Sequence, residues 1–133
     1  MPVVFFTIPE GRIDGPASER LLQRASETFA EILESPVDRI RAYIKTLPAH
    51  HCASGGVVPG TSPFFEFIVL EGRPLAQRQE LMKQFSEILA EETGIPLSQV
   101  RGMCRRVPAE EWCIAGKPTS EARAAHVSAL QKL

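Results

Sequence analysis

The residue with the most distinctive chemical potential is Pro2, which follows the first methionine and leads the apolar run in MPVVFFTIPEGR. If Met1 is removed, Pro2 carries a secondary amine on a rigid ring at the start of a predicted buried strand. An α-amine ordinarily titrates at about pH 8, and an apolar pocket with arginines nearby disfavours its cation. We therefore expect Pro2 to act as a general base that moves a proton between carbon and oxygen. The alternative is that Pro2 simply begins an edge strand.

Several arginines follow turns or precede apolar runs, where they could bind an anionic group. Arg73 comes just after an apolar run, a position at which β-α units bind ligands, and its planar fork matches a carboxylate. The alternative is a turn arginine that satisfies nearby backbone carbonyls. Arg12 occupies the corresponding place earlier in the chain, and Arg41 and Arg101 form a second corresponding pair. The sequence leaves open which of Arg12, Arg41 and Arg101 contacts a substrate.

These correspondences belong to an internal repeat. Pro2 aligns with Pro63 and Arg12 with Arg73, at an offset of 61 residues, and Arg41 aligns with Arg101 at an offset of 60. Pro63 is an internal residue whose nitrogen lies in an amide and cannot take a proton. The repeat therefore predicts duplicated architecture, in which only the first copy carries the amine.

Each half of the repeat predicts a strand, a helix of about five turns and a second strand. The first strands are the runs Val3 to Ile8 and Phe64 to Leu70, which are short and rich in Val, Ile and Phe. An apolar stripe marks each helix: Leu21, Leu22, Ala25, Phe29, Ile32 and Leu33 in the first half, and Leu81, Met82, Phe85, Ile88 and Leu89 in the second. Strands in such a β-α-β unit are expected to be parallel.

The predicted fold is α+β, with tandem β-α-β units forming a four-stranded sheet and both helices on one face. A single domain is expected over 1–133, with pseudo-repeats 2–60 and 63–118 and a C-terminal tail, 119–133, that forms a short closing helix. The Gly55-Gly56 pair predicts a turn between the halves. The other face of the sheet would stay bare, and we expect residues such as Val4, Phe6, Phe65 and Phe67 there. So much apolar surface predicts an oligomer.

Composition narrows the function further. The chain has 133 residues, 44% of them apolar and 23% charged, and a net charge of −1. It contains no basic run and no long apolar stretch, so we expect neither a nucleic acid nor a membrane as partner. Three cysteines without a framework predict a reduced, cytoplasmic protein. His50, His51 and Cys52 are adjacent and lack a spaced ligand pair, so no metal site and no cofactor are expected.

The motifs also resemble a known family. Pro2, the turn Glu10-Gly11-Arg12, the amphipathic helix and Arg41 resemble 4-oxalocrotonate tautomerase and its superfamily. The second half resembles the same unit and ends in EWCIAG, similar to the aromatic-then-glycine segment that closes the family's active site. The resemblance implies a homotrimeric, cofactor-independent keto–enol tautomerase acting on a small 2-oxo or 2-hydroxy unsaturated carboxylic acid. Arginines would clamp the substrate, and Trp112 would shield the amine.

Two further interpretations remain open. The segments Val37-Asp38-Arg39 and Gly72-Arg73-Pro74 resemble malonate semialdehyde decarboxylase, a fused two-unit relative, although Leu75 stands where that enzyme has a second arginine. A decarboxylase or hydratase would use protonated Pro2, with Asp38 positioning water. The third interpretation is a non-catalytic trimeric scaffold, which follows if Met1 is retained.

Overall fold

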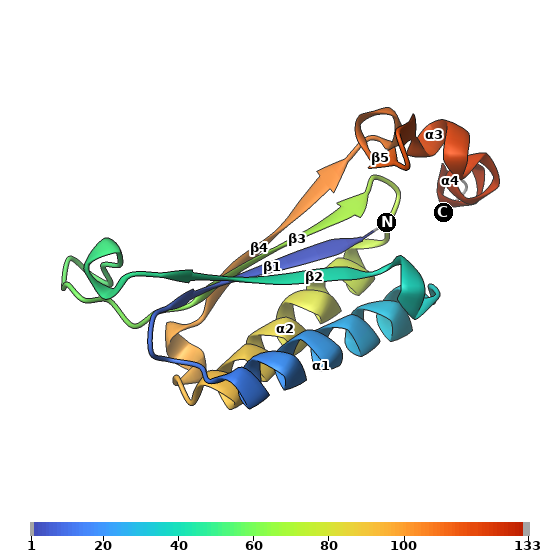
Figure 1. Cartoon of the computed structure of the whole chain (residues 1–133). Coiled ribbons are helices and arrows are strands. Elements are labelled where there is room, and N and C mark those ends of the chain that lie inside the picture. The colour runs from blue at the N-terminus through green and yellow to red at the C-terminus, as the bar shows by residue number, and fades with distance from the viewer. Residues whose placement is uncertain (1, 132–133) are drawn as a thin grey trace.

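Two strand–helix–strand units follow one another along the chain, and their strands form one mixed sheet with both helices on one face (Figure 1). In this computed structural model, which describes residues 2–131, the first unit is β1 (Val3–Pro9), α1 (Gly15–Leu33) and β2 (Arg41–Leu47). The second unit is β3 (Phe64–Leu70), α2 (Leu75–Thr93) and β4 (Arg101–Val107). This arrangement confirms the predicted fold class.

The strand order is β2-β1-β3-β4, with parallel neighbours within each unit and one antiparallel junction between the units. Each unit pairs its own strands in parallel, as expected when a helix connects them. The units meet through β1 and β3, which run antiparallel. The beginning of β1 therefore lies beside the end of β3, and the beginning of β3 lies beside the end of β1.

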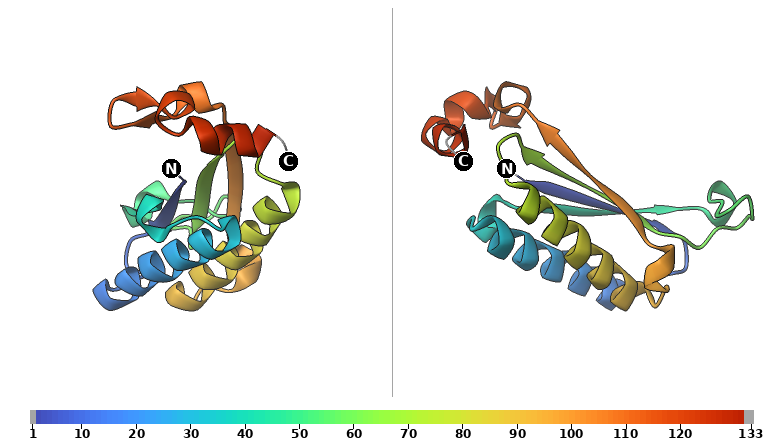
Figure 2. Two further views of the ribbon diagram at one scale, coloured as in Figure 1. Left: turned by 90° about the vertical axis from the view of Figure 1, so that its right-hand side faces the viewer. Right: turned by 180° about the vertical axis from the view of Figure 1, so that it is seen from behind.

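Smaller elements occupy the two ends of the sheet. They are the 3-10 helices η1 (Val37–Arg39), η2 (Ala49–His51), η3 (Leu97–Gln99) and η4 (Ala109–Glu111), the short strands β5 (Cys113–Ile114) and β6 (Lys117–Pro118), and the helices α3 (Thr119–Ala122) and α4 (Ala124–Gln131). The tail thus forms two short helices rather than the single closing helix that we expected. Two views show α3 and α4 at the end of the sheet where the N-terminus lies (Figures 1 and 2).

The helix boundaries follow from local chemistry. Asp14 caps α1, since its Oδ1 accepts a hydrogen bond from the backbone N–H of Ala17 at 2.8 Å, and Pro16 lies in the first turn. Gly94 ends α2 in a left-handed conformation with φ +71°, which glycine adopts without a steric penalty. None of the helices in the described part of the chain is long and apolar enough to cross a membrane.

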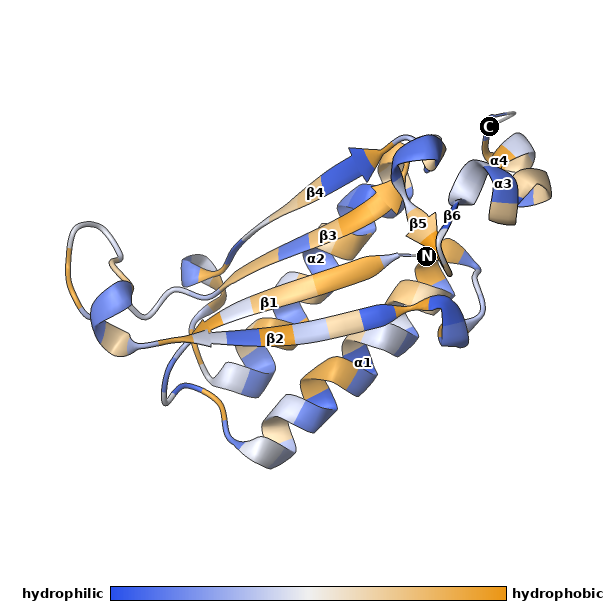
Figure 3. Cartoon of the chain, turned by 45° about the horizontal axis from the view of Figure 1, so that its top comes forward, coloured by the Kyte–Doolittle hydropathy of each residue, from blue (hydrophilic) through white to orange (hydrophobic). Residues whose placement is uncertain are grey.

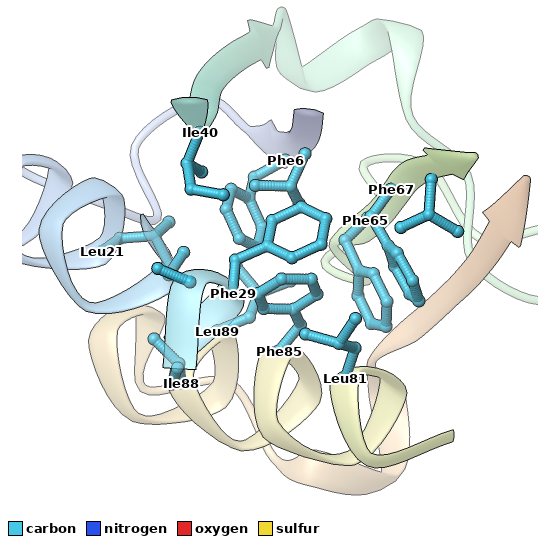
Figure 4. Packing of buried hydrophobic residues seen from close by; sticks show 14 of the residues in the cluster. Phe6, Leu21, Phe29, Ile40, Phe65, Phe67, Leu81, Phe85, Ile88 and Leu89 are labelled. Carbon is cyan, nitrogen blue, oxygen red and sulfur yellow. The ribbon is translucent and has the colours of Figure 1, made fainter. Parts of the chain in front are cut away.

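The core corrects one expectation about the sheet faces. Val4, Phe6, Phe65 and Phe67 point toward the helices and are almost completely buried, so they do not line the bare face. Phe85 of α2 lies at the centre of this cluster, with its ring centroid 5.3 Å from that of Phe67 (Figure 4). Both faces of β1 and β3 are apolar, so strand alternation could not show which face the helices cover.

The open face carries a different set of apolar side chains. Phe5, Tyr43, Phe64 and Met103 are 38%, 52%, 39% and 39% exposed. The rings of Phe5 and Tyr43 stack with their centroids 5.5 Å apart. Figure 3 shows the sheet from the side opposite the helices, with the hydrophobic colour strongest along β1 and β3.

The duplication extends into the connecting loops. The predicted Gly55-Gly56 turn is confirmed, because Ser54 and Val57 bond to each other across it. The pair Ala115-Gly116, 60 residues later, forms the turn between β5 and β6 with the same left-handed backbone. Each unit therefore ends in a small hairpin that projects beyond the sheet.

Candidate active site

The antiparallel pairing of β1 and β3 brings Pro2 to the turn that carries Arg73. Val3 pairs with Ile68 near the end of β3, and the carbonyl of Pro2 accepts a 3.1 Å hydrogen bond from the N–H of Arg41. A small cavity lies at this point. Its lining residues are Pro2, Leu33, Val69, Leu70, Arg73 and His126. Its volume is about 10 Å³, room for about one water molecule.

The guanidinium of Arg73 is held from two sides. Nη1 donates a hydrogen bond to the carbonyl of Leu33 at 2.9 Å, at the last residue of α1. Nη2 lies 3.3 Å from Nε2 of His126. Burial lowers the pKa of Arg73, and the charge of Arg39 lowers it further. Arg73 thus bonds to a backbone carbonyl, as expected for an arginine that stabilises a turn. It also presents its charge to the Pro2 cavity.

His126 is a functional candidate that the sequence did not reveal. Arginine can only donate, so Nε2 of His126 accepts the hydrogen bond and the ring is the neutral Nδ1–H tautomer. Burial lowers the pKa of His126, and the nearby charges of Arg73, Arg39 and Arg123 act in the same direction. No sequence signal marks this residue, because it reaches Arg73 only when the tail folds back across 53 residues of chain.

Arg41 and Arg101 make the same contacts in the two halves. Nη1 of Arg41 donates to the carbonyls of Asp38 and Ile40, at 2.8 and 3.0 Å. Nη1 of Arg101 donates to the corresponding carbonyls of the second unit, also at 2.8 and 3.0 Å. Since Arg101 makes these bonds beside a proline that cannot take a proton, the bonds belong to the architecture. Both arginines are exposed at the start of an edge strand.

Arg12 lies at the opposite end of the sheet from Pro2. It follows the end of β1, is exposed, and lines a shallow groove with Asp14 and with Glu92 of α2. The structure therefore places Pro2 with Arg73 and separates it from Arg12. This separation follows directly from the antiparallel pairing, which puts the turn of each unit beside the first proline of the other.

Asp38 and Trp112, the remaining predicted site residues, do not line the cavity. Asp38 is exposed in η1, and its backbone carbonyl bonds to Arg41. Trp112 is partly exposed beyond β4, and its carbonyl accepts bonds from the N–H and Oγ1 of Thr119, at 2.7 and 3.0 Å. Leu75 is exposed at the start of α2. Among the residues that the structure describes, no three His, Cys, Asp or Glu side chains gather as metal ligands.

Known proteins match this chain in sequence and in three-dimensional structure, although no family model matches it. A 2-hydroxymuconate tautomerase from Pseudomonas putida is 39% identical over 59 residues, which are 44% of this chain and 94% of that protein. The crystal structure of Pt0534 inactivated by 2-oxo-3-pentynoate is 27% identical, with a TM-score of 0.84, and the match covers 91% of this chain and 98% of that one. A fused 4-OT solved as an asymmetric trimer is 26% identical, with a TM-score of 0.83, covering 92% and 98%.

The shorter relative matches about half of this chain, and the fused structures match nearly all of it. Together with the duplicated units, these similarities define a class of protein built from two joined tautomerase units. The chain belongs to the tautomerase superfamily as a fused two-unit member. The resemblance inferred from the sequence motifs is therefore confirmed.

Proposed function

We propose that the protein is a cofactor-independent tautomerase that acts on a small 2-oxo or 2-hydroxy unsaturated carboxylic acid. The observation that carries this proposal is the placement of Pro2 and Arg73 on one cavity, although they are 71 residues apart in sequence. The relatives named 2-hydroxymuconate tautomerase support this reaction type and suggest 2-hydroxymuconate as the first substrate to test.

The surroundings of Pro2 suit a neutral amine. Leu33, Val69 and Leu70 supply an apolar lining, and the positive charge of Arg73 lies on the same cavity. Both features disfavour an ammonium group, so a Pro2 amine released by removal of Met1 would be available as a base. Met1 itself lies outside the described residues.

The proposed reaction moves one proton and leaves the atoms of the substrate otherwise unchanged. The Pro2 nitrogen removes the proton of the 2-hydroxyl group, and the C=O bond forms as the electrons of the adjacent C=C bond shift along the chain. The carbon that gains these electrons then takes the proton back from Pro2. Arg73 would hold the substrate carboxylate through a charge-assisted pair, which fixes the reacting carbon beside the amine.

The decarboxylase or hydratase alternative needs a protonated Pro2 and an acid that positions water. Asp38 was the residue predicted for that role, and it is exposed and does not line the cavity. The geometry therefore favours the tautomerase. Retention of Met1 would convert the Pro2 nitrogen to an amide and would favour the non-catalytic scaffold.

We also propose that the chain forms a homotrimer through the open face of the sheet. Phe5, Tyr43, Phe64 and Met103 expose apolar surface there, and one of the similar fused proteins is a trimer. Light scattering at micromolar concentration should give three times the mass of one chain, and a stable monomer would contradict this assignment. The three free cysteines are consistent with the cytoplasmic location that we propose.

The decisive experiment combines mass and chemistry on natively processed protein. The intact mass should correspond to a chain that begins at Pro2, and that chain should convert 2-hydroxymuconate to its 2-oxo isomer. 2-Oxo-3-pentynoate, which inactivates the related Pt0534, should label the Pro2 nitrogen. A full-length mass that includes Met1, or labelling confined to cysteines, would overturn the proposal.

A further inference from the structure

The C-terminal helix α4 lies directly over the candidate active site. Leu130 packs against Gly72, the residue before Arg73, so closely that a Cβ atom built on Gly72 would lie 3.0 Å from the Cβ of Leu130. Gly72 also has φ +104°, which other residues rarely adopt. One turn earlier in the helix, His126 reaches Nη2 of Arg73. The tail therefore contacts the backbone and the side chain of the same turn.

Few buried contacts hold α4 in this position. The helix has eight residues, and Leu130 is the only one of them that is buried. An isolated helix of that length is marginal in water, so its position depends on the few contacts it makes. Segments with so few buried contacts open at a small fraction of the cost of global unfolding.

The cavity beneath α4 is too small for the proposed substrate. Its volume of about 10 Å³ accommodates about one water molecule, whereas a four- to six-carbon acid needs many times that space. The groups that should bind the acid are also engaged, since Nη1 of Arg73 bonds to Leu33 and Nη2 faces His126. An acid that binds Nη2 of Arg73 at this cavity would therefore have to displace its contact with His126 of α4.

We infer that His126 occupies the place on Arg73 that the substrate carboxylate takes, and that α4 is a latch which the carboxylate displaces. The inference rests on the proposed function and adds a mode of regulation to the same site. A carboxylate forms a stronger, charge-assisted pair with a guanidinium than a neutral imidazole does. An acid therefore releases the latch by replacing its contact on Arg73, and an uncharged ketone does not.

The first test follows the latch directly in the full-length protein. Hydrogen exchange of residues 124–131 is measured with increasing 2-oxopentanoate, a saturated acid that carries the required carboxylate, and with 2-pentanone as the uncharged control. The acid should accelerate exchange in this segment several-fold, and the ketone should leave it unchanged. Exchange that stays constant or slows with the acid would overturn the inference.

The second test separates the latch from the chemistry. His126→Ala should increase the rate at which 2-oxo-3-pentynoate labels Pro2 several-fold and should accelerate exchange in 124–131. His126→Gln, which restores an acceptor, should return both rates toward those of the parent. Ser128→Ala, an exposed position on the same helix, should match the parent. A labelling rate that falls in His126→Ala would mean that this residue assists the reaction, and the latch would be wrong.

The two proposals can fail separately. If Pro2 is never labelled in a chain whose mass shows that Met1 is absent, the proposed function fails. The exchange measurement still decides on the latch, because His126→Ala must then loosen α4 relative to the parent. If Pro2 is labelled at one rate in every variant and exchange in α4 is unchanged, the latch fails and the proposed function stands.

Discussion

The two ends of the sheet share one design and differ in what covers them. At each end, the proline that leads one unit lies near the Gly-Arg turn and hairpin of the other unit, and an arginine caps the adjacent 3-10 helix. At the Pro2 end, Arg73 is partly buried beneath α4 and shares a cavity with Pro2. At the Pro63 end, Arg12 is exposed in an open groove.

The duplication thus provides the same scaffold at both ends of the sheet, whereas the contacts with α4 are made at the Arg73 turn. Only the first proline can carry an amine, because the nitrogen of Pro63 lies in a peptide bond. Only the second unit is followed by a tail, and α4 folds back over Arg73 rather than over Arg12. Matched substitutions at the two ends can therefore separate architecture from function.

The largest expected effect comes from the two prolines. Pro2→Ala should lower kcat/KM for 2-hydroxymuconate by about 100-fold or more, in line with the contribution of a positioned general base. Pro63→Ala should keep kcat/KM close to that of the parent, because its nitrogen has no role in the reaction. Equal losses in both variants would mean that the prolines matter only for the strands they lead.

The arginine turns provide the second comparison. Arg73→Ala should remove a charge-assisted pair of about 2–4 kcal/mol, which corresponds to a loss of roughly 30- to 1000-fold in kcat/KM. Arg73→Lys should rescue poorly, since a point charge cannot reproduce the planar fork. Arg12→Ala should keep kcat/KM close to that of the parent. If the Arg12 variant loses activity and the Arg73 variant keeps it, the substrate binds at the other turn.

The glycines of the same turns should differ in stability and in local dynamics. Gly11 and Gly72 have φ +85° and +104°, so alanine at either position should cost about 1–2 kcal/mol of unfolding free energy. Only Gly72 contacts the tail, because a Cβ at Gly11 meets nothing within 4 Å. Hydrogen exchange of 124–131 should therefore rise in Gly72→Ala alone. A rise in both variants would indicate that α4 responds to general destabilisation.

The smallest effect is a pH dependence specific to the Pro2 end. Burial lowers the pKa of His126 in the folded protein, so protonation favours the unfolded state and an open tail. The contribution of neutral His126 to the stability of the folded protein is complete above about pH 6.5 and decreases as the pH falls below that value. The urea concentration at the midpoint of unfolding should decrease more between pH 7.5 and pH 5.5 in the parent than in His126→Gln. An identical fall in both proteins would exclude His126 as the source.

The sequence by itself was sufficient to predict the helices and strands and to name part of the candidate site. Periodicity gave the strands and helices, because an apolar stripe on a helix and a short β-branched run on a strand are local patterns. The offset between Pro2 and Pro63 identified the duplication, and the Gly-Arg turn marked Arg73 as a ligand-binding candidate. These inferences depend only on residues that are close in sequence, or on a repeat that can be found by aligning the sequence with itself.

Only the tertiary structure decided how the units face each other. A helical crossover makes the strands within a unit parallel, but a loop as long as the one before Pro63 leaves the direction of β3 relative to β1 unspecified. The antiparallel choice brings Arg73, and not Arg12, to Pro2. The buried face of β1 and the contact of His126 likewise depend on long-range packing, because an apolar strand and a short exposed helix carry no local signal of their partners.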